Sequence, residues 1–194
     1  MQKDFGDTVR LIEGLRYIFT QAGDRPCVVN LSLGTNGGPH DGTSPVEQAI
    51  DALVTERPNR AVVIAAGNAY EDGIHRTGDI PVGGYADLEW KIEPFDPTPN
   101  EIEIWYSKDN QLELEIIHSS GVSVGNVPLG IDTFLALPVG GVEQKLMTIS
   151  HIKDPDNNDH VIHIFHNPAF QPHGGLWTLR LHRRDANPEN ATFH

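Results

Sequence analysis

Apolar residues recur at two different spacings along this chain, and the spacing changes near residue 85. Before it, two stretches repeat their apolar positions at helical spacing, at residues 11–19 and 46–54. A largely apolar run follows each of them, at residues 28–33 and 61–66, and each run predicts a strand. A strand, a helix and a second strand in this order predict a parallel pair joined by a right-handed crossover.

After this change, apolar and polar residues alternate, which predicts short strands with one buried face. Residues 102–106, 112–116 and 177–181 alternate in this way, and residues 161–165 form a nearly continuous β-type run. Turns rich in glycine, asparagine and aspartate separate the runs. Several short strands at this spacing predict an antiparallel β-sandwich.

The predicted fold class is therefore α/β plus all-β. Residues 1–82 are expected to form a partial parallel α/β segment, and residues 83–194 are expected to form the sandwich. Three prolines are interpreted as the linker that enters the sandwich: Pro94, Pro97 and Pro99.

Composition limits the classes of partner. The chain has 14 Lys and Arg against 27 Asp and Glu, a formal charge of -13, and such a surface repels the phosphates of nucleic acids. No apolar run approaches the roughly 20 residues that a membrane span needs, so neither nucleic acid nor membrane is expected as a partner. The single cysteine, Cys27, excludes an internal disulfide.

The two predicted strands end in small residues and one amide. Ser32, Leu33 and Gly34 follow the first apolar run, and the second ends in Ala65, Ala66, Gly67 and Asn68. In open α/β sheets, ligands bind beyond the carboxyl ends of the strands, so both ends are expected on one rim. Small residues there leave room for a ligand. The alternatives are close helix–strand packing for the small residues and a capping role for Asn68.

These two segments, residues 30–34 and 63–68, and the helix between them resemble the subtilisin-like serine proteases. The resemblance implies that Ser32, Leu33 and Gly34 pair through their backbone with an extended peptide. It implies that Ala65, Ala66 and Gly67 form the floor of a specificity pocket, and that Asn68 is the oxyanion-hole donor. It also implies a serine endopeptidase, a peptide or protein substrate, and an extracellular location.

The catalytic triad of that family is missing. The triplet Gly42-Thr43-Ser44 resembles the nucleophile motif, but it precedes the strand with Asn68, whereas the family's nucleophile follows it. Ser44 and Glu47 instead form a capping box, with Pro45 at the first helical position. The chain is therefore expected to be an internal, inactive fragment with an inserted jelly-roll-like sandwich, and its unpaired sheet edges predict self-association.

The rival hypothesis is a non-catalytic pseudoprotease or a β-sandwich module that binds carbohydrate, peptide or a partner chain. A shallow groove with exposed Trp90, Trp105 or Trp177 would favour it, because aromatic platforms suit sugars.

No cofactor is expected. His160, His163 and His166 are spaced so that His163 points to the other face of a strand, which is poor for metal chelation. A structural calcium ion has no specific motif, because carboxylates on the solvent face of a strand account for four alternating residues: Glu101, Glu103, Glu113 and Glu115.

Overall fold

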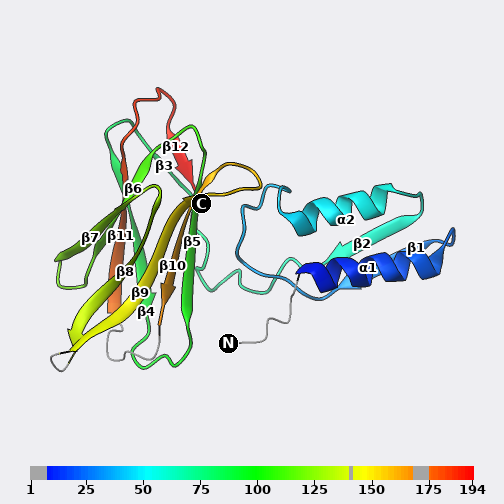
Figure 1. Ribbon diagram of the computed structural model, residues 1–194, viewed down its shortest axis with the longest axis horizontal. Coiled ribbons are helices and arrows are strands. Elements are labelled where there is room, and N and C mark those ends of the chain that lie inside the picture. Colours follow the sequence, from blue (N-terminus) through cyan, green and yellow to red (C-terminus); the bar gives the residue numbers. More distant parts are fainter. Residues whose placement is uncertain (1–7, 140–141, 168–174) are drawn as a thin grey trace. The chain divides into compact units, whose positions relative to one another are not determined.

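A computed structural model describes residues 8–139, 142–167 and 175–194 (Figure 1). The chain divides into two compact units, Met1–Ile74 and His75–His194. The division lies eight residues before the boundary expected at residue 82. The difference arises because Gly78–Ile80 forms a strand that pairs with the last strand of the second unit.

The first unit is a small α/β layer of two helices and two strands. Helix α1 (Thr8–Ala22) precedes strand β1 (Cys27–Leu31), and helix α2 (Pro45–Thr55) precedes strand β2 (Arg60–Ile64). The strands are parallel, as the sequence predicts, with Cys27 opposite Arg60 and Leu31 opposite Ile64. Both strands stop two residues before the ends of their apolar runs, so the small residues lie just beyond the sheet.

The core of this unit lies between the helices and one face of the sheet. It is formed by Leu15, Phe19, Val29 and Leu53, and strand residues of the same face pack against them. Val28 and Val63 alternate to the other face, where their exposed fractions are 68% and 51%. The two-stranded sheet is thus covered on one side only within this unit.

Ser44 caps helix α2 as predicted. Its Oγ accepts a hydrogen bond from the backbone N–H of Glu47 at 3.4 Å, and the Glu47 carboxylate accepts one from the Ser44 N–H at 3.2 Å. Pro45 occupies the first turn of the helix. The hydroxyl of Ser44 therefore serves the helix start.

The second unit consists of two antiparallel sheets (Figure 1). The six-stranded sheet has the order β3-β12-β5-β10-β9-β8, and the four-stranded sheet has the order β4-β11-β6-β7. The strands are β3 (Gly78–Ile80), β4 (Tyr85–Ile92), β5 (Asn100–Tyr106), β6 (Leu112–Ile117), β7 (Ser123–Pro128), β8 (Ile131–Val139), β9 (Val142–Lys153), β10 (His160–His166), β11 (Gly175–Arg183) and β12 (Ala191–Phe193).

Alternation along the strands places one set of side chains in a shared core. In β6, the residues Leu112, Leu114 and Ile116 are buried, while Glu113 and Glu115 are only half-buried. One cluster joins buried residues from both sheets, which defines a β-sandwich. The coarse fold class, a small α/β part followed by an antiparallel sandwich, is therefore confirmed.

The proline-rich stretch is not the linker into the sandwich. Pro94, Pro97 and Pro99 lie between β4 and β5, and β4 already belongs to the four-stranded sheet. The prediction was wrong because Leu88 of β4 pairs with Leu179 of β11, a distant partner that local composition does not reveal. Neither helix of the described residues has the length and apolar content that a membrane crossing requires.

Candidate functional site

The candidate site is the rim of the first unit, where β1 and β2 end together. The Ala65 N–H donates a hydrogen bond to the Leu31 carbonyl oxygen at 3.1 Å, one residue beyond the end of β2. A Cβ built on Gly34 would lie 3.9 Å from the Ala65 carbonyl oxygen, which is ordinary van der Waals contact. The two strands therefore end next to each other, with Gly34 beside Ala65.

All seven predicted site residues are exposed in this unit. The Leu33 side chain has an exposed fraction of 47%. Exposure argues against the alternative in which Ala65, Ala66 and Gly67 serve helix–strand packing, because the described helices do not cover them. The small residues leave open space beside the strand ends.

Gly67 gives the rim its bend. Its φ angle is +89°, in the left-handed region that favours glycine, and no atom lies within 4 Å of a Cβ built there. The glycine is therefore required by backbone conformation rather than by a close neighbour. The next residue, Asn68, is exposed, and within the described residues its side chain makes no capping hydrogen bond of the kind that Ser44 makes.

The sequence motifs do not include Tyr70, which follows Asn68 by two residues and is 98% exposed. It lies in a tight turn closed by a hydrogen bond from the Asp72 N–H to the Ala69 carbonyl oxygen at 3.1 Å. An aromatic residue in the segment that follows Asn68 is the sequence signal that could have found it. Tyr70 and Leu33 add apolar surface to the rim segments.

The chemistry of the rim is limited to hydrogen bonding and shape. None of the seven predicted residues carries an ionisable side chain, and the one hydroxyl among them belongs to Ser32. A rim of this kind can align the backbone of a bound peptide and donate a hydrogen bond from an amide. It offers no base that would activate a nucleophile.

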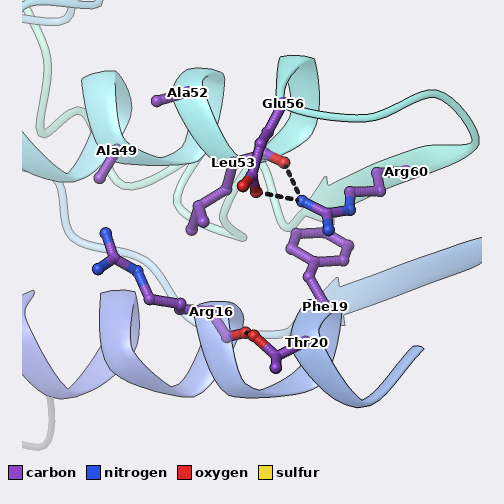
Figure 2. Close-up of a pocket in the computed structure, with 8 residues that line it drawn as sticks. All are labelled: Arg16, Phe19, Thr20, Ala49, Ala52, Leu53, Glu56 and Arg60. Atoms are coloured by element: carbon purple, nitrogen blue, oxygen red, sulfur yellow. Dashed lines mark hydrogen bonds and ion pairs between the residues drawn. The ribbon is translucent and has the colours of Figure 1, made fainter. Parts of the chain in front are cut away.

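A separate hollow of about 510 Å³ lies between the two helices, at the opposite end of β2 (Figure 2). Arg60 donates from Nη1 to the Leu53 carbonyl oxygen at 2.9 Å and to the Glu56 carboxylate at 2.7 Å, and its guanidinium lies 4.8 Å from the ring centroid of Phe19. The hydrogen bond from Arg60 lowers the pKa of Glu56. Arg60 and Glu56 therefore neutralise each other, and Arg16 adds a further positive charge to the lining of the hollow. Its lining residues are Arg16, Phe19, Thr20, Ala49, Ala52, Leu53, Glu56 and Arg60.

The tryptophans of the sandwich do not form an exposed aromatic platform. Trp177 and Trp105 are only 1% and 6% exposed, and Trp90 is half-buried against the core. The tryptophans therefore give no support to a carbohydrate-binding module.

The histidines of β10 face both sides of the six-stranded sheet. His160 and His166 are buried, and His163 lies on the other face, as the spacing predicts. The described part of the chain contains no group of three or more histidine, cysteine, aspartate or glutamate side chains that could hold a metal ion.

No family model matches this chain, and no curated protein matches it. Among solved structures, the chain is similar to the Clostridium perfringens CspB protease, with a TM-score of 0.76 and 22% sequence identity. The match covers 96% of this chain and 39% of that chain, so this chain spans about two fifths of the neighbour's length. The similarity establishes a shared fold with a protease.

The assignment to the subtilisin-like serine proteases is therefore wrong as a family assignment. At 22% identity the neighbour shows the fold alone, and no family model supports membership. Most of the described strands are antiparallel, and the parallel α/β part that carried the two motifs has only two strands. Two short motifs at strand ends are too local to establish a family.

Proposed function

We propose that this chain supplies the peptide-aligning rim and the oxyanion donor of a serine-type endopeptidase. The observation that carries the proposal is the pair of exposed strand ends, held together by the hydrogen bond from Ala65 to Leu31 at 3.1 Å. The fold that the chain shares with a protease supports it. The nucleophile and its base are expected from outside these 194 residues.

Peptide alignment would use the backbone of residues 32–34. This segment continues from β1, is exposed, and makes no backbone hydrogen bond to another described residue. An extended substrate can therefore add to it as a further strand, with main-chain hydrogen bonds giving affinity and pockets giving specificity. Ala65, Ala66 and Gly67 would leave space for one substrate side chain.

Asn68 would stabilise the transition state. Attack on a peptide carbonyl moves negative charge onto its oxygen, and a preorganised N–H donor binds that oxyanion more strongly than the neutral carbonyl. The exposed amide of Asn68, placed after the bend at Gly67, is the candidate donor. The interaction forms fully only in the transition state, so it should affect kcat rather than KM.

The test is to replace Asn68 in the longer protein to which the proposal assigns this chain. Asn68→Ala should lower kcat about a hundred- to a thousandfold with little change in KM, which is the effect of removing one oxyanion-hole donor in subtilisin. Asn68→Asp should lower kcat at least as much, because an isosteric carboxylate removes the donor and repels the oxyanion.

Asn190→Ala is the matched control, because Asn190 is an exposed amide in the second unit, and it should leave kcat unchanged. A kcat that survives Asn68→Asp would remove the oxyanion assignment. Equal losses of kcat in the Asn68 and Asn190 variants would do the same.

A further inference from the structure

Three titratable side chains meet in the interior of the β-sandwich. Tyr106 of β5, His151 of β9 and His160 of β10 have exposed fractions of 2%, 0% and 7%. The Tyr106 Oη lies 2.6 Å from His151 Nε2, and the ring of His160 lies edge-on to Tyr106 with centroids 5.0 Å apart. The three strands are neighbours in the six-stranded sheet, in the order β5, β10, β9.

Hydrogen-bond partners fix the tautomer of His151. Its Nδ1 lies 3.0 Å from the carbonyl oxygen of Val127, and a carbonyl can only accept, so Nδ1 carries the proton. The Nε2 atom of the neutral ring is then an acceptor, and the Tyr106 hydroxyl donates to it. The Tyr106 oxygen also receives a backbone hydrogen bond from Leu112. All these polar atoms are satisfied while His151 is neutral.

Protonation of His151 would break this arrangement. A second N–H would point at the Tyr106 oxygen, and the hydroxyl proton would lose its acceptor within a buried site. The ring would also carry a charge with no carboxylate within ion-pair distance among the described residues. Burial of an unpaired charge and of an unsatisfied donor both oppose folding.

Protonation of His160 would also oppose folding, for a different reason. Its Nδ1 is buried and has no hydrogen-bond partner, so a proton added there would have no acceptor. Desolvation is the main cause that lowers the pKa of His160, and it also lowers the pKa of His151. The charge of a protonated His160 would lower the pKa of His151 further, because like charges repel.

The remaining charges around the cluster do not offset the lowering of the pKa of His151 and His160. The strands that flank His151 present Ile131 of β8 and Ile162 of β10. Near His160, Asp159 raises its pKa and Lys153 lowers it, and a backbone hydrogen bond with Asn110 raises it. Asp185 acts on Tyr106 but is itself paired with Arg183 at 2.8 Å.

We propose that the cluster of Tyr106, His151 and His160 is an acid switch of the β-sandwich, which stays closed while both rings are neutral and opens when they take up protons. Well above pH 6.5 the rings are neutral in both the folded and the unfolded chain, so the sandwich keeps its full stability. As the pH falls through about 6.5, the histidines bind protons in the unfolded chain more strongly than in the folded sandwich. The unfolding equilibrium constant then rises, with a limiting slope of about tenfold per histidine for each pH unit.

Tryptophan fluorescence tests the switch in the 194-residue chain, because its three tryptophans, Trp90, Trp105 and Trp177, all lie in the sandwich. Urea unfolding followed by this signal should show the equilibrium constant rising from pH 6.5 to pH 5.5, up to a limit of about thirtyfold for two histidines that bind no proton in the folded chain. This window lies above the range in which ordinary carboxylates titrate. The variants His151→Gln and His160→Gln should each remove about half of the logarithmic change.

His163→Gln is the matched control, because His163 lies on β10 but points out of the core with 43% of its side chain exposed. Its Nδ1 lies 3.6 Å from the Glu103 carboxylate at this exposed site, and the variant should change the pH dependence less than either core variant. Equal flattening by His163→Gln, or an unchanged slope in both core variants, would overturn the proposal.

A measurement on the unaltered chain covers the case in which a core variant does not fold. The Cε1–H resonances of His151 and His160 should titrate below the ordinary histidine range while the tryptophan signal stays native, because burial lowers the pKa of both rings. An ordinary titration of both core rings within the folded sandwich would contradict the switch.

Discussion

The two units of this chain bury their sheets to different extents. In the sandwich, both sheets contribute to one core, and the central strands β5, β10 and β9 have a neighbour on each side. In the first unit, the two-stranded sheet is covered on one face, and each strand has one free edge among the described residues. The proposed site therefore lies on the less enclosed unit, where backbone groups remain accessible to a peptide.

Two spectroscopic signals separate these units. Both described helices belong to the first unit, and all three tryptophans belong to the second. The far-UV helical signal thus reports mainly on the first unit, while tryptophan fluorescence reports on the sandwich. The comparison between the units can be tested by variants that move one signal and not the other.

The largest effect is expected from Phe19→Ala. Phe19 is 1% exposed and is among the few fully buried side chains of the first unit, and its ring also lies under the Arg60 guanidinium. Truncation of a buried phenylalanine costs about 3–5 kcal/mol. A unit with so small a core should lose its helical signal, while the tryptophan fluorescence stays native.

Tyr17→Ala is the matched control, because Tyr17 lies on the same helix but is 66% exposed. It should leave both signals unchanged. Simultaneous loss of helical signal and tryptophan fluorescence in Phe19→Ala would show that the two units unfold as one rather than separately.

A smaller effect is expected in the sandwich from Gly78→Ala. A Cβ at Gly78 would lie 2.7 Å from Cζ of Phe193, which is 2% exposed. Forced overpacking of this kind costs about 1–3 kcal/mol. Urea unfolding followed by tryptophan fluorescence should show the loss, and a second change, Phe193→Leu, should recover part of it by removing the ring.

Gly125→Ala provides the comparison for this variant, because Gly125 lies on β7 and no atom lies within 4 Å of its added Cβ. Its free energy of unfolding should stay within about 1 kcal/mol of the unaltered chain. If Gly78→Ala were equally neutral, the short β3–β12 pairing would not contribute to the closed sandwich.

The sequence predicts some elements and misses others, and the reason is physical. Alternation within β6, from Leu112 to Ile116, is a local signal, and it predicts the buried face of the sandwich correctly. The placement of β4 depends on pairing with β11, about 90 residues later, so local composition makes the prolines after β4 resemble a linker. The contact between Tyr106 and His151 likewise joins residues 45 positions apart, and no local pattern reveals it.

For the site, the sequence predicts position better than role. The two strand ends follow from hydrophobic runs that stop at small residues, and the parallel pairing brings them to one rim. Whether Asn68 donates to an oxyanion depends on groups that a strand-end pattern does not contain. The roles of the rim residues therefore stay predictions.

The smallest effect on stability is expected from Ser44→Ala, and it also tests what this hydroxyl does. Loss of the cap should destabilise the first unit by about 1 kcal/mol, seen as a lower midpoint of the helical signal with unchanged tryptophan fluorescence. Ser32→Ala, at an exposed serine outside any helix, should leave this midpoint unchanged. In the longer protein to which the proposal assigns this chain, Ser44→Ala should retain peptidase activity, because the hydroxyl and the Glu47 carboxylate are engaged with each other at 2.6 Å and with the helix start. Abolished activity in a folded Ser44→Ala variant would instead make Ser44 the nucleophile and would contradict its structural role.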